Sequence, residues 1–257
     1  MTPSLFDLSN RVALVVGGTS GIGRTLALGL ADAGADVVAT GRRAALVDEV
    51  AQEIETRGKR TIRQPADVDD AASLERLREV CLRELGQIDI LICAAGITRK
   101  TPTLSMSESD WSQVIGTNLT GTFRACRIVG AHMLERRQGR IITIASLSSF
   151  LGFFEVSAYT ASKSAVAGFT RALAVEWASY GVTVNAIAPG VFRTDLNRAL
   201  LDSPCGQELL MRTPMHRFGE LDELVGAAVF LASDAAKFVT GHILAVDGGY
   251  LASGVNQ

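Results

Sequence analysis

The feature that most constrains the fold of this chain is the alternation of short apolar runs with longer helical segments. Most of the short runs are apolar at consecutive positions, as expected for strands that are covered on both faces. Strands and helices that alternate at this spacing form βαβ units. The pattern therefore predicts an α/β fold with one doubly wound parallel sheet and helices on both faces. Strands are expected at Val12–Val16, Val37–Thr40, Ile88–Cys93, Arg140–Ala145, Val182–Ala188 and Ile243–Val246.

The helical segments show the periodicity of amphipathic helices. In Ala71–Leu85 the apolar residues Leu74, Leu77 and Cys81 recur three and four positions apart, and charged residues occupy the opposite side. A glycine closes several of these segments just before the next strand, where helices commonly end in a left-handed residue. Further helices are expected at Ile22–Ala33, Ala44–Thr56 and Ser157–Ser179, with terminal glycines at Gly34, Gly58 and Gly86.

The chain is expected to form a single domain that covers residues 1–257. A length of 257 residues allows one large domain or two small ones, and the sequence contains no linker, repeat or low-complexity segment. The long irregular segment from Gly190 to Gly219 predicts a substrate lid, because loops of that length in compact domains are usually functional. Its apolar residues, including a short helical run at Leu196–Leu201, would either close over a substrate or pack on another subunit.

Composition excludes several classes of protein. With 47% hydrophobic and 20% charged residues the chain is not intrinsically disordered, and a net charge of −2 supplies no field for nucleic acid or an acidic membrane. The four cysteines and three histidines are too scattered for a disulfide framework or a metal site. The N-terminal residues lack a basic signal-peptide region, and the longest apolar stretch, Ile88 to Ile97, is too short to span a bilayer. We therefore expect a cytoplasmic protein with a small-molecule substrate and without metal, nucleic-acid or membrane partners.

A glycine-rich loop follows the first strand and opens the first helix. Its sequence is Gly17-Gly18-Thr19-Ser20-Gly21-Ile22-Gly23. Glycines at such a turn let the backbone approach a pyrophosphate, which then sits on the N–H groups at the helix N-terminus. The spacing differs from G-x-G-x-x-G, so a tight turn without a ligand is the alternative.

Two arginines stand where a dinucleotide-binding chain usually carries an acid. In NAD-binding folds a carboxylate about 20 residues beyond the glycine loop binds the 2′-hydroxyl of the ribose. This chain has Arg42 and Arg43 at that place, directly after the second strand. Because forked guanidinium donors suit a 2′-phosphate, the pair predicts a preference for NADP(H), mainly through Arg42. The alternative is that both arginines are solvated residues at the start of a helix.

A tyrosine, a lysine and a serine form the candidate catalytic group. Tyr159 and Lys163 lie four residues apart in one helical segment, so their side chains share a face. A nearby ammonium would lower the pKa of a phenol, about 10 when free, by as much as about 3 before desolvation opposes the shift, and would make tyrosine a usable acid or base. Ser146 ends a strand at the edge of the sheet where ligands bind, and its hydroxyl could hydrogen-bond a substrate oxygen. An ordinary surface pair is the alternative for the tyrosine and the lysine.

Taken together, these motifs resemble those of the short-chain dehydrogenase/reductase family over nearly the whole chain. The resemblance implies a Rossmann-like sheet, a nicotinamide dinucleotide as cofactor, and the reversible conversion of a secondary alcohol to a ketone. The motifs occur in the family's order: the glycine loop, Asp67-Val68 after the third strand, Ala95-Gly96 after the fourth, Asn118-Leu119, Ser146, Tyr159 to Lys163, Pro189-Gly190 and the ending Thr240 to Gly249.

The resemblance also implies a role for each site residue. In the implied catalytic set, Tyr159 exchanges the proton with the substrate oxygen and Ser146 orients that oxygen. Lys163 lowers the tyrosine pKa and holds the nicotinamide ribose, while Asn118 maintains a bend and a water in a proton relay. The implied cofactor-binding residues are Gly17, Thr19, Ser20, Gly21, Ile22, Gly23, Arg42, Arg43, Asp67 (near the adenine), Val68, Ala95, Gly96, Tyr159, Lys163, Pro189, Gly190 and Thr194 (near the nicotinamide carboxamide).

Two departures from the family pattern concern the cofactor site. Val16 stands where the family usually has a threonine that braces the glycine loop. Cys93 and Ala94 replace two asparagines that pin the neighbouring strand and border the adenosine ribose. We therefore expect weaker or altered cofactor binding without loss of activity, and we interpret Cys93 as a small apolar filler rather than a reactive thiol.

Three further segments are similar to the gluconate 5-dehydrogenase and 2-deoxygluconate 3-dehydrogenase group of the family. They are Gly96 to Pro102, Arg212 to Pro214 and Gly249 to Gly254. This similarity implies a sugar acid such as gluconate or 5-ketogluconate as the substrate. Arg99 and Lys100 would then face its carboxylate, unless they are simply solvated, and Ser148 is a third candidate substrate residue.

The sequence therefore predicts an NADP(H)-dependent oxidoreductase, with NAD(H) as the second cofactor. A 3-oxoacyl-carrier-protein reductase is an alternative, because it shares the same core. A nonenzymatic dinucleotide sensor is another, against which the intact Ser146, Tyr159 and Lys163 argue. A methyltransferase dependent on S-adenosylmethionine would carry an acid where Arg42 stands. Because relatives commonly form tetramers through the helices that contain Asn118 and Tyr159 and through the C-terminus, a homotetramer is expected.

Overall fold

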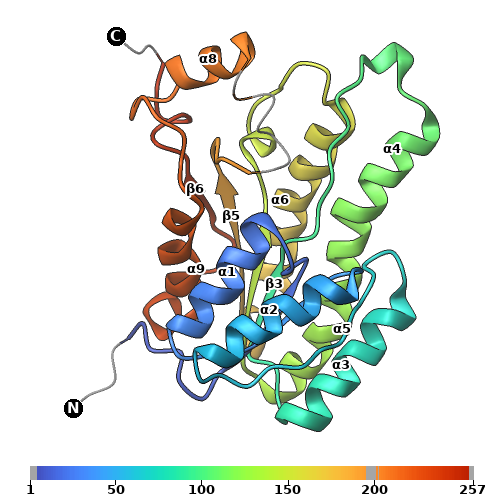
Figure 1. The fold of residues 1–257 in the computed structure, drawn as a ribbon, viewed down its shortest axis with the longest axis vertical. Coiled ribbons are helices and arrows are strands. Elements are labelled where there is room, and N and C mark those ends of the chain that lie inside the picture. The colour runs from blue at the N-terminus through green and yellow to red at the C-terminus, as the bar shows by residue number, and fades with distance from the viewer. Residues whose placement is uncertain (1–4, 195–200, 202, 255–257) are drawn as a thin grey trace.

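The computed structural model describes residues 5–194, 201 and 203–254. Its centre is a six-stranded sheet in the order β2-β1-β3-β4-β5-β6, in which every neighbouring pair of strands is parallel (Figure 1). The predicted doubly wound parallel sheet is confirmed, and each predicted strand is present close to its expected bounds. The strands are β1 (Val12–Val16), β2 (Asp36–Thr40), β3 (Ile90–Cys93), β4 (Gly139–Ile144), β5 (Val182–Pro189) and β6 (Ile243–Val246).

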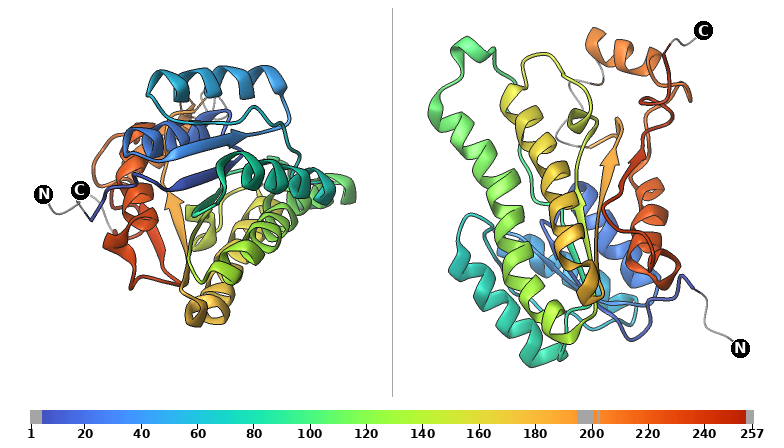
Figure 2. Two further views of the ribbon diagram at one scale, coloured as in Figure 1. Left: turned by 90° about the horizontal axis from the view of Figure 1, so that it is seen from below. Right: turned by 180° about the vertical axis from the view of Figure 1, so that it is seen from behind.

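Helices cover both faces of the sheet (Figure 2). One layer contains α1 (Gly21–Asp32), α2 (Ala44–Thr56) and α9 (Val225–Ala232), and the other contains α3 (Ala71–Leu85), α5 (Gly121–Arg136) and α6 (Ser157–Trp177). None of the described helices is long and apolar enough to cross a membrane. The other described elements are α4 (Glu108–Ile115), α8 (Pro204–Met211), the π-helical turn η2 (Gly116–Thr120), and the 3-10 turns η1 (Thr103–Ser105), η3 (Leu147–Ser149), η4 (Ala178–Tyr180), η5 (Leu221–Leu224) and η6 (Asp234–Ala236).

The predicted helices agree closely with the observed ones. The bounds of α2 and α3 match their predictions, α1 begins and ends one residue earlier than expected, and α6 ends at Trp177 rather than Ser179. The three predicted terminal glycines all adopt positive φ: +112° at Gly34, +72° at Gly58 and +82° at Gly86. Glycine takes this conformation without steric cost, which explains why the helices end there.

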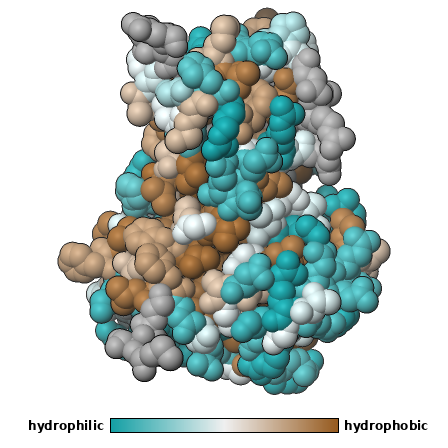
Figure 3. All heavy atoms as spheres, turned by 60° about the vertical axis from the view of Figure 1, so that its left-hand side comes forward, coloured by the Kyte–Doolittle hydropathy of each residue, from teal (hydrophilic) through white to brown (hydrophobic). Residues whose placement is uncertain are grey.

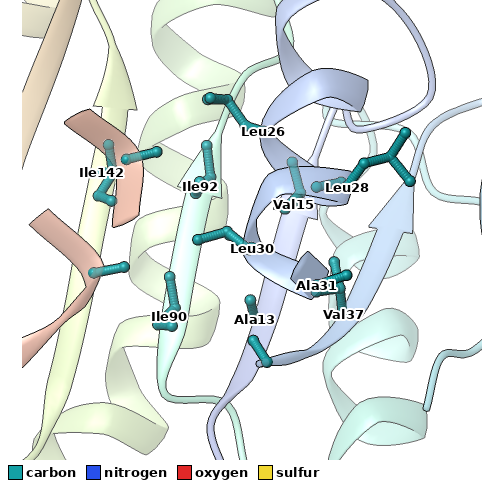
Figure 4. Close-up of a cluster of buried hydrophobic side chains, with 14 of the residues drawn as sticks. Ala13, Val15, Leu26, Leu28, Leu30, Ala31, Val37, Ile90, Ile92 and Ile142 are labelled. Atoms are coloured by element: carbon teal, nitrogen blue, oxygen red, sulfur yellow. The ribbon is translucent and has the colours of Figure 1, made fainter. Parts of the chain in front are cut away.

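Side chains that alternate in direction explain why the strands are apolar at every position. In β1, Ala13 and Val15 pack with Leu30 of α1 on one face of the sheet (Figure 4). Leu14 and Val16 belong to the apolar cluster on the opposite face, which α3 and α5 cover. All of these side chains are at most 2% exposed. The end of β1, from which the glycine loop departs, is therefore held rigidly from both sides.

The segment before Asp67 is not a strand, which corrects the expectation of a third strand there. It runs beside β2 and is joined to it by isolated backbone hydrogen bonds. Val37 N–H donates to Arg60 O at 3.0 Å, and Ala66 N–H donates to Gly41 O at 3.1 Å. These bonds are too far apart along the chain to form a continuous ladder, but they still bring Asp67 to the carboxyl end of β2.

The segment from Gly190 to Gly219 returns to the place where it leaves the sheet. Phe192 and Gly219 form a parallel β-bridge, and Gly219 N–H donates to Val191 O at 2.9 Å. The predicted helical run at Leu196–Leu201 lies outside the described residues, apart from its last residue, which is buried.

Candidate active site

The predicted site residues follow the carboxyl ends of adjacent strands. The glycine loop follows β1, Gly96 follows β3, Ser146 follows β4 and Gly190 follows β5. Because β1, β3, β4 and β5 are neighbours in the sheet, these segments come together along one edge. Ligands of open parallel sheets bind at this edge.

Close backbone approaches shape the glycine loop. Gly17 has a φ of +83°, and a Cβ on it would overlap the backbone of Ala95 after β3. A Cβ on Gly23 would overlap the carbonyl of Gly17. The N–H groups of Gly17 and Gly18 both donate to Thr40 O at 2.9 Å, which ties the loop to the end of β2. The loop therefore needs glycine both for its conformation and for its packing.

The start of α1 is open. Nothing lies within 4 Å of the place where a Cβ on Gly21 would stand, and the exposed Ser20 side chain makes no capping hydrogen bond to the helix. The first N–H groups of a helix lack intrahelical partners and stand at the positive end of its dipole, so they bind anions. This cradle of glycines fits the pyrophosphate of a dinucleotide.

Arg42 and Arg43 stand beside this cradle. A Cβ on Gly41 would lie 2.7 Å from the hydroxyl oxygen of the buried Thr19, so the glycine loop and the end of β2 are in contact. Both arginines are exposed, and within the residues that the structure describes neither forms an ion pair. Their donors are therefore available to a phosphate next to the loop.

Asp67 and Val68 are partly engaged in local packing. The Asp67 carboxylate accepts a hydrogen bond from Asp69 N–H at 3.0 Å. Val68 is buried, and a Cβ on Gly121 of α5 would lie 2.9 Å from its Cβ. Contacts of these two residues with the adenine remain a prediction.

The serine, the tyrosine and the lysine converge between β4 and α6. The Ser146 hydroxyl accepts a hydrogen bond from Ser148 N–H at 3.1 Å and forms a hydrogen bond with the phenol of Tyr159. The Lys163 ammonium donates to Ile144 O at 2.6 Å and lies 5.7 Å from the centroid of the Tyr159 ring. Because Lys163 is only 5% exposed, the tyrosine and the lysine are not an ordinary surface pair.

The protonation of this group differs from the expectation based on the sequence. Burial raises the pKa of Tyr159, and the hydrogen bond with Ser146 opposes this rise without cancelling it. Burial also lowers the pKa of Lys163 to about 8. The net pKa of Tyr159 is therefore raised rather than lowered, because desolvation outweighs the lowering expected from the ammonium. The physical reason is that both groups lose hydration, and that the ammonium donates to Ile144 O.

Two serines hold the turn that carries Ser146 against α6. The Ser149 hydroxyl donates to Lys163 O at 2.7 Å, and the Ser164 hydroxyl donates to Ser148 O at 3.2 Å. Both bonds join η3 to the helix that carries Tyr159, so they fix the position of the catalytic hydroxyl relative to the phenol. Ser148 is only 4% exposed at this junction, and its contact with a substrate remains a prediction.

Asn118 links three segments of the site. It lies in η2, the π-helical turn that interrupts the path from α4 to α5, which agrees with the predicted bend. Its side-chain oxygen accepts from Ile97 N–H at 2.8 Å, and its amide donates to Ile97 O and to the Ser162 hydroxyl, both at 2.9 Å. Both amide donors are therefore used by protein atoms, and the predicted water relay remains untested.

Ser162 is a positioning residue to which the sequence analysis gave no role. Its fully buried hydroxyl donates to Tyr159 O at 2.7 Å while it accepts from Asn118. It thus fixes the first turn of α6 against the bend between α4 and α5. The available signal was its position three residues after the tyrosine, within one helical turn.

Gly96 leaves space beside the lysine. A Cβ on Gly96 would stand 3.4 Å from the side-chain oxygen of Asn118 and 3.6 Å from the Lys163 ammonium nitrogen. At the end of β5, Pro189 leads into Gly190, where a Cβ would lie 2.5 Å from the Asp247 Cα. Gly190 is therefore required by packing against Asp247, whereas Gly96 leaves room for a ligand beside Lys163. The proposed contact of Thr194 with a cofactor remains a prediction.

The departures from the family pattern fill apolar space. Val16 is 2% exposed and packs in the cluster between the sheet and α5. Cys93 is buried with its sulfur 3.9 Å from that of Cys126, and this contact together with burial raises the pKa of the Cys126 thiol. This agrees with the interpretation of Cys93 as a filler. Among the described residues, no group of three or more His, Cys, Asp or Glu side chains could hold a metal ion.

The two basic residues after β3 differ in their surroundings. The Arg99 guanidinium donates to the Gln113 side chain at 3.0 Å and lies 3.7 Å from the Asp110 carboxylate, both on α4. The expectation that Arg99 faces a substrate carboxylate would require it to leave these partners. Lys100 is exposed and forms no ion pair within the part of the chain that the structure describes. Of the two residues, Lys100 is therefore the one whose charge is available to a substrate carboxylate.

The sheet order, the open glycine cradle and the Ser146–Tyr159 pair beside a buried lysine define a dinucleotide-dependent oxidoreductase. The family model described as enoyl-(acyl carrier protein) reductase matches residues 16–251. The chain belongs to this branch of the short-chain dehydrogenase/reductase family, whose named relatives are dehydrogenases and reductases, and it acts on CH–OH groups.

Known proteins are similar to this chain in sequence and structure over almost its full length. It is 41% identical to gluconate 5-dehydrogenase of Gluconobacter oxydans over 98% of both chains. It is 42% identical to 2-dehydro-3-deoxy-D-gluconate 5-dehydrogenase of Bacillus subtilis over 96% of both. The crystal structure of a gluconate 5-dehydrogenase from Burkholderia cenocepacia, in complex with NADP and tartrate, has a TM-score of 0.93 at 40% identity and covers 96% of this chain and 98% of that one.

Proposed function

We propose that this chain is an NADP(H)-dependent oxidoreductase that interconverts a secondary alcohol and a ketone on a sugar acid, such as gluconate and 5-ketogluconate. The observation that carries the proposal is the placement of Tyr159 between Ser146 and Lys163, at the sheet edge that also holds the open start of α1. The names of the sugar-acid relatives support the choice of substrate.

The residues along this edge fit a nicotinamide dinucleotide, which supplies the hydride when bound. The glycine cradle at α1 would hold the pyrophosphate, and Lys163 would hold the nicotinamide ribose. Arg42 and Arg43 would bind the 2′-phosphate, because their donors are exposed and unpaired among the described residues. The relative that binds NADP supports this preference, and NAD(H) is the second cofactor we propose.

The chain's own residues handle the proton. Burial raises the pKa of Tyr159, so the phenol is protonated near neutral pH and can donate to a ketone oxygen. The Ser146 hydroxyl, held by Ser148 N–H, orients that oxygen and stabilises the charge that develops on it. With a pKa of about 8, Lys163 is an ammonium below that pH and stabilises the phenolate as it forms. Alcohol oxidation, which needs the phenolate, is favoured at alkaline pH.

A 3-oxoacyl-carrier-protein reductase is the second candidate, since the matching family model is described as an enoyl-(acyl carrier protein) reductase. Such an enzyme would have to admit a phosphopantetheine arm and an acidic carrier, so carrier-linked ketones would far outperform 5-ketogluconate. A nonenzymatic sensor is disfavoured, because it would have no need of the hydrogen bond between Ser146 and Tyr159.

We further propose that the chain forms homotetramers. Trp111 of α4 and Phe123 of α5 are 42% and 45% exposed, and the Phe123 ring packs edge-on against Phe169 of α6 at 6.1 Å. Exposed aromatic rings on adjacent helices suit contact with a second copy. A second apolar area lies on the side of the molecule shown in Figure 3, where α9 and the edge strand β6 lie.

The segment from Gly190 to Gly219 would act as the lid over the substrate. A cytoplasmic location remains a prediction.

The test is Tyr159→Phe, which removes the phenolic proton and keeps the ring. The variant should lose about 10²- to 10⁴-fold in kcat with 5-keto-D-gluconate and NADPH while its Kd for NADPH stays within about twofold. The same ketone is compared with a 3-oxoacyl carrier conjugate in the wild-type enzyme. Turnover of the variant near that of the wild type would defeat the mechanism, and exclusive use of the carrier-linked ketone would defeat the sugar-acid substrate.

A further inference from the structure

The turn after β6 brings another tyrosine to the edge of the sheet that holds the catalytic group. Asp247 to Tyr250 follow β6 directly, and β6 is the neighbour of β5 in the sheet. The turn touches the start of the proposed lid, since a Cβ on Gly190 would lie 2.5 Å from the Asp247 Cα. It also touches the return of that segment, because Met215 N–H donates to Gly248 O at 3.2 Å. The turn that carries Tyr250 therefore lies beside both ends of the segment that leaves and re-enters the sheet edge.

The Tyr250 ring packs on the loop that connects the catalytic serine to the catalytic tyrosine. Its centroid is 6.3 Å from that of Phe153, with 33° between the ring planes. Phe153 stands between η3, which follows Ser146, and the start of α6, which carries Tyr159. The turn that carries Tyr250 thus contacts both ends of the proposed lid, and the Tyr250 ring itself contacts this loop.

The Tyr250 hydroxyl has no hydrogen-bond partner among the described residues, although the side chain is buried. The residue is 7% exposed, and buried tyrosines usually place the hydroxyl on a hydrogen-bond partner. Among the residues that the structure describes, none hydrogen-bonds this hydroxyl. A fixed ring whose polar end has no partner among the described residues is the kind of group that orients a ligand in a pocket.

We propose that Tyr250 is a specificity-determining residue whose phenol hydrogen-bonds a hydroxyl on the polyhydroxy chain of the substrate. The inference rests on the proposed sugar-acid function and adds a second recognition point, remote from the reacting carbon. A phenol both donates and accepts, which matches a chain hydroxyl that does the same. Because Phe153 already holds the ring, little side-chain freedom is lost when the substrate binds.

The experiment compares two tyrosine variants. Tyr250→Phe removes the hydroxyl and keeps the ring on Phe153. Tyr180→Phe is the matched control, at a 45% exposed tyrosine that stacks with Arg137. Kinetics at saturating NADPH use 5-keto-D-gluconate, erythrulose (a polyhydroxy ketone without a carboxylate) and levulinate (a keto acid without hydroxyls). Levulinate is measured as a competitive inhibitor if it is not reduced.

We expect Tyr250→Phe to raise KM for both hydroxylated ketones about fivefold to tenfold, with kcat within about twofold. The constant for levulinate should not change, and Tyr180→Phe should leave all three ketones unaffected. Equal changes for all three ketones, or no change for any, overturn the proposal. A fall in kcat with every ketone together with a lower Tm also overturns it, because a structural role would produce that result.

The failure of the proposed function is distinguishable from the failure of this inference. If the wild-type enzyme reduces erythrulose but not 5-keto-D-gluconate, the sugar-acid substrate is wrong. The role of Tyr250 is then still decided by whether Tyr250→Phe changes the KM for erythrulose but not the constant for levulinate. If it reduces neither hydroxylated ketone, both proposals are overturned.

Discussion

Replacing Lys163 by methionine removes a buried ammonium and keeps an unbranched apolar side chain. In the folded protein this lysine is 5% exposed, and burial lowers its pKa from 10.5 to about 8. Each pKa unit corresponds to about 1.36 kcal/mol, so keeping the group charged in the fold costs about 3 kcal/mol relative to water. Little of this cost is screened by solvent, because almost none of the side chain is exposed.

The sign of the pH dependence follows from the direction of the shift. The unfolded chain keeps the lysine proton up to about pH 10.5, whereas the folded chain releases it near pH 8. Between these values the unfolded state binds more protons, so the free energy of unfolding of the wild-type protein rises with pH. From pH 7 to pH 9.5 the wild-type protein should gain about 2 kcal/mol relative to Lys163→Met, which lacks the titrating group.

Urea unfolding at several pH values between these limits measures the difference. Lys237→Met, at an exposed lysine, is the matched control, and its difference from the wild-type protein should stay constant over the same range. At any single pH the loss of the bond to Ile144 O opposes the gain from removing a buried charge, so the sign of the difference at one pH is not informative and its change with pH is. A difference between Lys163→Met and the wild-type protein that does not vary with pH would refute the reasoning.

Three further outcomes are expected. Arg42→Ala should raise KM for NADPH by about 10- to 100-fold and leave KM for NADH unchanged in steady-state kinetics. Gly96→Ala should lower kcat/KM by about 10²-fold without moving the urea midpoint. Its methyl fits the fold at 3.4 Å from the Asn118 oxygen but takes space beside Lys163 that the nicotinamide ribose would need. The ratio of alcohol oxidation to ketone reduction should rise with pH and keep rising beyond pH 10, since oxidation needs the phenolate and burial raises the pKa of Tyr159 above its ordinary value of 10; a ratio that is flat, or that levels off near neutral pH, in initial-rate assays would contradict this.

The sheet and the backbone of the site could be predicted from the sequence because their signals are local. Apolar runs and helical periodicity depend on neighbouring residues, so strand and helix bounds were close to the observed ones. The glycines of the loop and the four-residue spacing of Tyr159 and Lys163 likewise carry their geometry within one turn. The segment before Asp67 could not be assigned in this way, because its pairing with β2 depends on isolated tertiary bonds.

Contacts between distant elements could not be predicted from spacing. The contacts of Arg99 with Asp110 and Gln113 depend on where α4 lies relative to the loop after β3. The hydrogen bonds from Asn118 through Ser162 to Tyr159 join η2 to α6, and the sequence of neither segment alone predicts them.

The opposite pKa shifts of Tyr159 and Lys163 have one cause, and it is not the spacing of the two residues. Burial penalises the charged form of each, which raises the pKa of the phenol and lowers that of the ammonium. Spacing on α6 therefore fixes which groups meet, while the apolar surroundings decide which of them carries the proton. A phenol that keeps its proton at neutral pH can donate it to a ketone oxygen. The burial that makes the charged form of Lys163 unfavourable therefore also favours ketone reduction at neutral pH.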